Sequence, residues 1–172
     1  GIGLVPEGVA IAANRARPGD VVIVSGTIGD HGMAIMSVRA GLTFETELVS
    51  DSAALHTLVA AMLGVTENIH CLRDATRGGV AAVLNELAEQ SQAGFALDEE
   101  AVPVRPAVQA ACEMLGMDPL YVANEGKLVA VLPREHADAV LAVMHAHELG
   151  RDAAIIGEVV ADHAGMVIAN TA

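Results

Sequence analysis

Aromatic residues and positive charge are both scarce in this chain. Its 172 residues include no tryptophan, one tyrosine and two phenylalanines, and nine Lys and Arg stand against 22 Asp and Glu, which gives a net charge of −13. Binding to nucleic acid or to an anionic membrane surface needs a basic footprint, and binding to single strands usually adds stacking rings. We therefore expect no nucleic acid and no membrane among the partners.

Long apolar runs and a cysteine framework are also missing. The longest uncharged stretch, residues 52–66, has 15 residues and contains His56, whereas a spanning helix needs about 20 apolar residues. No signal peptide is visible, and the two cysteines form no C-x-x-C motif, so we expect a cytoplasmic protein. Cys71 lies in an apolar run and Cys112 on an apolar helix face, which predicts that both are buried.

Two hydrophobic periods alternate along the chain. The i, i+3, i+4, i+7 spacing of an amphipathic helix predicts helices over residues 55–62, 80–87, 108–115 and 137–144. Apolar runs of strand length lie at residues 21–24, 69–72, 94–97, 120–123, 127–132, 154–159 and 166–169. This alternation predicts one α/β domain over residues 1–172, a mixed β-sheet flanked by helices.

Two boundaries carry further predictions. The run 120–123 and the run 127–132 are separated by only a few polar residues, which predicts a hairpin or a tight corner. Asp51 or Ser52 is a suitable N-cap for the helix over 55–62.

The turn at residues 73–79, with the sequence RDATRGG, is the first candidate site. It lies between an apolar run and a predicted helix and ends in two glycines. A helix N-terminus offers unpaired N–H groups and a positive dipole end, so the turn suits a phosphate, a carboxylate or a carbamoyl oxygen. The candidate binding residues are Arg73, Asp74, Thr76, Arg77, Gly78 and Gly79. The alternative is a structural Gly-Gly turn whose arginines form salt bridges with acidic neighbours.

The turn Asn124-Glu125-Gly126-Lys127 is the second candidate. It places an amide, a carboxylate and an amine between two apolar runs, and such a carboxylate can act as a general base. The alternative is a polar turn in which Glu125 pairs with Lys127.

The glycine-rich segment at residues 25–32 follows a predicted strand but does not match the dinucleotide fingerprint G-x-G-x-x-G. We interpret it as a turn that faces a cleft, with Gly29, Asp30, His31 and Gly32 as cleft residues. His145 and His147 would need further partners to bind a metal, and none is evident nearby, so we expect no metal site.

These motifs resemble the HypE family of hydrogenase maturation proteins, within the AIR synthase-related (PurM-like) superfamily. The resemblance is to the family's C-terminal domain and is carried by RDATRGG, by DPLYVANEGK at residues 118–127, and by segments 17–39, 69–91, 111–131 and 150–159. Ala75 stands where the family usually has proline, which changes turn rigidity and not the chemistry.

The resemblance implies a fold and a reaction. HypE-like proteins use ATP to dehydrate a carbamoyl group on their own C-terminal cysteine to a thiocyanate, which provides cyanide for the iron of NiFe hydrogenase. Glu125 is then the expected catalytic base, and Asn124 the expected holder of the carbamoyl group. ATP and Mg²⁺ are expected to bind mainly through an N-terminal domain, which also forms a homodimer. The expected partners are the carbamoyltransferase HypF and the HypC–HypD scaffold.

The chain also departs from the family. The family's tail ends in Pro-Arg-Ile-Cys, whereas this chain ends at Ala172, and neither Cys71 nor Cys112 matches the tail cysteine. We therefore expect part of a longer protein, inactive alone. The alternatives are another AIR synthase-like enzyme, of the selenophosphate or thiamine-phosphate type, and a non-catalytic docking or dimerisation module.

Overall fold

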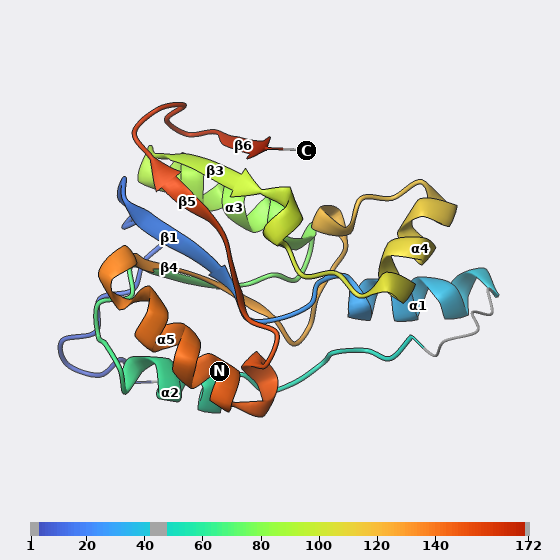
Figure 1. The fold of residues 1–172 in the computed structure, drawn as a ribbon, viewed down its shortest axis with the longest axis horizontal. Helices are drawn as coiled ribbons and strands as arrows, with labels where there is room; N and C mark the ends of the chain where they lie inside the picture. The colour runs from blue at the N-terminus through green and yellow to red at the C-terminus, as the bar shows by residue number, and fades with distance from the viewer. Residues whose placement is uncertain (1–3, 42–47, 171–172) are drawn as a thin grey trace.

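The computed structural model describes residues 4–41 and 48–170, and within them the chain forms one six-stranded sheet (Figure 1). Its strands are β1 (Asp20–Val24), β2 (Cys71–Asp74), β3 (Gly94–Asp98), β4 (Leu128–Pro133), β5 (Ala154–Val160) and β6 (Val167–Asn170). The strand order is β2-β4-β1-β5-β3-β6, and all neighbours are antiparallel except the parallel pair β3 and β6. The predicted mixed α/β sheet is confirmed.

Helices cover both faces of this sheet. They are α1 (Asp30–Ala40), α2 (His56–Leu63), α3 (Gly79–Ser91), α4 (Pro106–Leu115) and α5 (Arg134–Ala146). Figure 1 shows α3 on one face, α2 and α5 together on the other, and α1 beside α4 beyond the end of the sheet.

The central strand β1 is apolar because both faces of the sheet are covered at this strand. Val22 and Val24 point into the core that contains α3, whereas Val21 and Ile23 point into the core with α2 and α5. A strand covered on both faces needs apolar residues at every position, and all five residues of β1 except Asp20 are hydrophobic.

A third, smaller core joins α1 to α4. Met33 packs there with Val108, Ala111 and Cys112 of α4 and with Val122, and all five side chains are buried. The two cysteines are buried and free, as predicted, and burial raises the pKa of both thiols.

The predicted strand at 120–123 is wrong. Residues Pro119–Tyr121 form a single turn of 3₁₀-helix, η2, because the side chain of Asp118 accepts the N–H of Leu120 at 2.8 Å and proline occupies the first position of the turn. The segment is the tight corner and not the hairpin, since β4 pairs with β1 and β2.

The N-cap prediction for α2 is also wrong. The residue before α2 is Leu55, which makes no side-chain cap, and Asp51 bonds elsewhere. Among the helices of the described segments, none is both long and apolar enough to cross a membrane.

Candidate functional site

Three loops that are distant in the sequence meet at Asn124. The Oδ1 atom of Asn124 accepts the N–H of Gly29 at 2.8 Å, and its Nδ2 atom donates to the carbonyls of Ala75 and Val122, both at 3.0 Å. The side chain is completely buried. One amide therefore fixes the loops that hold all three predicted motifs, at residues 25–32, 73–79 and 122–127.

This geometry determines what Asn124 can do. Both amide hydrogens and one lone pair of its oxygen bond within the chain, which leaves a single acceptor direction. A buried amide with these partners positions the loops around it, because losing it would leave several buried polar groups unpaired.

Glu125 has the opposite environment. Its side chain is exposed and forms no ion pair or hydrogen bond with any described residue, while its backbone N–H donates to Oδ1 of Asp51 at 3.3 Å. The alternative pairing of Glu125 with Lys127 is absent, because Nζ of Lys127 lies 3.1 Å from Oδ2 of Asp51. The carboxylate of Glu125 is thus available to a ligand.

Asp51 is the residue that sequence reasoning misplaced. Its side chain is only 6% exposed and that of Lys127 13%, so the two form a nearly buried ion pair beside Glu125. No local pattern could have shown this, because Asp51 lies more than 70 positions before its partners and sits in a plausible cap position.

The arginines of the 73–79 turn differ in their contacts. Nη2 of Arg73 lies 3.0 Å from Oε2 of Glu86 on α3, and Nε lies 3.9 Å from Asp74 at the exposed end of β2. Arg73 therefore matches the salt-bridge alternative. Arg77 is exposed and forms no ion pair within residues 4–41 and 48–170.

The glycines of this turn begin α3. Gly78 and Gly79 have φ angles of 77° and 65°, in the left-handed region. A side chain at Gly79 would overlap the carbonyl of Leu120 and lie 2.7 Å from that of Val122, so the space is filled by protein backbone. At the start of α3, Arg77 is exposed and Thr76 is half-buried, while the N–H of Gly79 donates to the carbonyl of Thr76 at 3.0 Å. The guanidinium of Arg77 is therefore the group of this turn that best suits an anion.

Asp30 is held inside the 25–32 loop. Its side chain is 3% exposed, accepts the hydroxyl of Thr27 at 2.6 Å and lies 3.5 Å from Nε of Arg105. Burial raises the pKa of Asp30, while the Thr27 hydroxyl and the charges of Arg105 and Lys127 act in the opposite direction.

The other residues of this loop make packing and tethering contacts. A side chain at Gly29 would meet Val108 at 2.8 Å, and one at Gly32 would overlap Val122. His31 is half-buried, and its Nδ1 lies 2.8 Å from the hydroxyl of Ser50.

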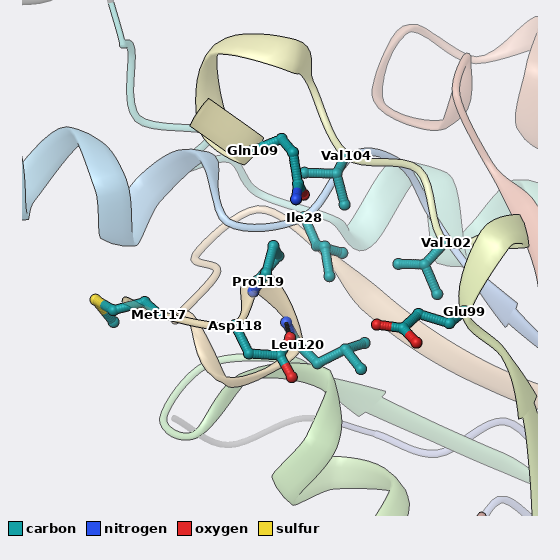
Figure 2. A pocket seen from close by; sticks show the side chains of 9 residues that line it. All are labelled: Ile28, Glu99, Val102, Val104, Gln109, Met117, Asp118, Pro119 and Leu120. Carbon is teal, nitrogen blue, oxygen red and sulfur yellow. Dashed lines mark hydrogen bonds between the residues drawn. The ribbon is translucent and has the colours of Figure 1, made fainter. Parts of the chain in front are cut away.

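A pocket of about 380 Å³ lies behind the 25–32 loop (Figure 2). Figure 2 shows the side chains of Glu99 and Gln109 pointing towards its centre, with Ile28 and Leu120 among its apolar walls. This volume is in the range of small-molecule sites. None of the predicted site residues lines the pocket, so it is separate from the exposed carboxylate of Glu125.

The two histidines make protein contacts. Nε2 of His145 lies 2.8 Å from the carbonyl of Ala153, and His147 accepts the N–H of Leu149 and lies 3.1 Å from the hydroxyl of Thr57. Across the described parts of the chain, no three His, Cys, Asp or Glu side chains lie close enough together to hold a metal ion.

Comparison with known proteins gives consistent matches. Carbamoyl dehydratase HypE of Rhizobium leguminosarum bv. viciae is 62% identical over 163 residues, which cover 94% of this chain and 47% of the relative. A crystal structure of a HypE–HypF complex is 48% identical with a TM-score of 0.92, covering 96% of this chain and 53% of that chain. A crystal structure of HypE in complex with ATP is 49% identical with a TM-score of 0.89, covering 94% and 50%.

The chain spans about half the length of the relatives it matches. The family model described as "AIR synthase related protein, C-terminal domain" matches residues 17–170, which is most of the sequence. The chain therefore belongs to the AIR synthase related protein, C-terminal domain family, and within it to the HypE type.

Proposed function

We propose that this chain forms part of an ATP-dependent carbamoyl dehydratase that acts in NiFe hydrogenase maturation, with Glu125 as the general base. One observation carries the proposal: Glu125 presents an exposed carboxylate without a partner in the described residues, on a turn whose backbone bonds to Ala75 through the N–H of Asn124 and the carbonyl of Lys127. The 62% identity to a carbamoyl dehydratase supports the choice of reaction.

The proposed reaction needs a base at the carbamoyl nitrogen. A cysteine S-carboxamide and ATP give a thiocyanate, ADP and phosphate. The carbamoyl oxygen attacks the γ-phosphorus and leaves as phosphate, while nitrogen loses both of its protons and forms the C≡N bond. A carboxylate within hydrogen-bond reach of that nitrogen accelerates such a proton transfer, typically by about 10²–10⁴-fold.

The neighbouring residues support this base in different ways. Asn124 fixes the turn from the buried side, which suits positioning of the carbamoyl group through its neighbours. Thr76, Arg77 and the start of α3 at Gly78-Gly79 suit the transferred phosphate, because a helix N-terminus and a guanidinium both favour an anion. Arg73 and Asp74 flank this anion site, with Arg73 held by Glu86.

ATP and Mg²⁺ are assigned mainly to the part of the enzyme that this chain does not span. A structure of HypE with ATP is known. The described residues hold no cluster of acidic side chains that could ligate Mg²⁺, so no step is assigned here to the metal.

The proposed partners follow from the HypE relatives. A HypE–HypF complex supports a carbamoyltransferase partner that loads the cysteine. We further propose a homodimer formed through the N-terminal half, a HypC–HypD scaffold that accepts the cyanide, and a cytoplasmic location.

The proposal is tested with the full-length protein that carries this domain, loaded with a carbamoyl group by its HypF partner. Addition of ATP is expected to remove one water from the modified cysteine, as measured by mass spectrometry of the tail peptide. If ATP instead phosphorylates selenide or thiamine phosphate, the alternative enzymes are correct. Binding to HypF without any ATP-dependent change of mass would identify a docking module.

A further inference from the structure

We propose that Asp51 is the residue that positions Glu125 for proton transfer, an inference that rests on the proposed function of Glu125. Asp51 contacts all three residues of the turn that follow Asn124. It accepts a hydrogen bond from the backbone of Glu125, forms an ion pair with Lys127 and packs against Gly126.

One carboxylate holds the residues on both sides of Gly126. Oδ1 of Asp51 accepts the backbone N–H of Glu125 at 3.3 Å, and Oδ2 lies 3.1 Å from Nζ of Lys127. Oδ2 is buried and has no well-directed hydrogen bond from the described residues, so its contact with Lys127 is electrostatic. Loss of either charge would leave the other nearly buried and uncompensated.

The backbone of residues 51–53 also packs against Gly126. A side chain at Gly126 would overlap the carbonyl oxygen of Asp51 and lie 3.1 Å from the N atom of Ala53, so the segment 51–53 lies directly against the turn. Ser50, one residue earlier, bonds to His31 of the opposite loop at 2.8 Å. Residues 50–53 therefore bridge the two loops that flank the site.

The charges of Lys127 and Asp51 also act on Asp30. Lys127 lowers the pKa of Asp30, whereas Asp51 raises it, so the ammonium of Lys127 is a counter-charge to both buried carboxylates. Asp51 thus fixes the backbone of Glu125 and keeps Lys127 directed away from the Glu125 carboxylate, which stays unpaired among the described residues. A misplacement of about 1 Å at a reacting group costs about 10²-fold in rate, so this positioning is expected to be visible in turnover.

The test uses the full-length enzyme and a double-mutant cycle of Asp51→Ala and Glu125→Gln, with kcat and KM for ATP measured in the dehydration step. Asp51→Ala is expected to lower kcat by about 10- to 100-fold, with KM for ATP unchanged. The double variant is expected to be no slower than Glu125→Gln alone, because Asp51 acts through Glu125. The control is Asp138→Ala, an exposed carboxylate on α5.

The inference would be overturned if Asp51→Ala kept the wild-type kcat or changed only KM. It would also be overturned if the decrease in kcat of the double variant equalled the product of the decreases in the two single variants. If Asp51→Ala fails to fold, Asp51→Asn/Lys127→Gln replaces it, since it keeps an oxygen for the Glu125 N–H and removes both charges. The double variant Asp51→Asn/Lys127→Gln is expected to have a higher kcat than Asp51→Asn alone. Equal kcat values for the two would contradict the proposal. A wild-type rate in Glu125→Gln would instead overturn the proposed function itself.

Discussion

Gly79 shows how a single residue in a candidate binding turn can be fixed by packing. Gly79 and Gly116 have the same φ of +65°, but a side chain at Gly116 would meet nothing within 4 Å, whereas one at Gly79 would overlap the backbone of the 120–122 corner. We expect Gly116→Ala to lower the free energy of unfolding by about 1–2 kcal/mol, the usual cost of a left-handed residue. Gly79→Ala should cost more than about 4 kcal/mol or prevent folding. Urea denaturation of both variants measures the difference, and equal losses would show that the corner can move.

The buried carboxyl of Asp30 should make the free energy of unfolding depend on pH. Burial raises the pKa of Asp30, so between its ordinary value and the raised value the folded state holds more protons than the unfolded state. The contribution of Asp30 to the free energy of unfolding therefore falls as the pH rises through that window, and it stays lower at higher pH. Asp30→Asn keeps an acceptor for the Thr27 hydroxyl and removes the titration.

The measurement is urea denaturation of the wild type and Asp30→Asn at a series of pH values across that window. The wild type is expected to lose stability relative to the variant as the pH rises. Asp138→Asn, at an exposed position, is the control and should show no such trend. A wild type that gains relative stability with rising pH would contradict the assigned environment.

At the scale of elements, the pair α1 and α4 depends on a small core of its own. Met33 of α1 is fully buried against α4, whereas Met114 on α4 is 70% exposed. Met33→Ala should lower the free energy of unfolding by about 2–5 kcal/mol because it leaves a cavity. Met114→Ala should change it by less than about 0.5 kcal/mol. Denaturant unfolding separates the two, and similar effects would mean that α4 packs differently.

The elements also show where sequence reasoning succeeds. Amphipathic spacing located α2, α3, α4 and α5, and apolar runs located all six strands within a few residues, because both patterns are local consequences of facing one core. The run at 120–123 is not a strand, because a proline and the Asp118 cap begin a 3₁₀ turn there and override the strand pattern.

The candidate site was only partly predictable for a related reason. The three motifs were visible as local patterns, but the contacts that join them are long-range. Asn124 reaches Gly29 and Ala75, and Asp51 reaches Lys127, across dozens of residues. An ion pair between distant residues leaves no periodic signal, so the local pattern at Asp51 indicates only a cap for the nearest helix.

At the scale of the whole molecule, the chain is strongly acidic and resembles about half of a HypE protein. It spans about half the length of its HypE relatives and carries a net charge of −13, and we propose Thr76 and Arg77 at the start of α3 as its contact with an anion. We infer that this half provides the base and one phosphate contact, and that complete ATP binding requires the other half.

The most direct test of this account is Glu125→Gln in the full-length enzyme. The amide keeps the size and hydrogen bonding of the side chain and removes its basicity. In a single turnover followed by mass spectrometry, carbamoylation of the tail cysteine should persist, while the ATP-dependent loss of water should slow by about 10²–10⁴-fold. Formation of thiocyanate at the wild-type rate in this variant would contradict the account, because Glu125 would then be only a residue of the turn.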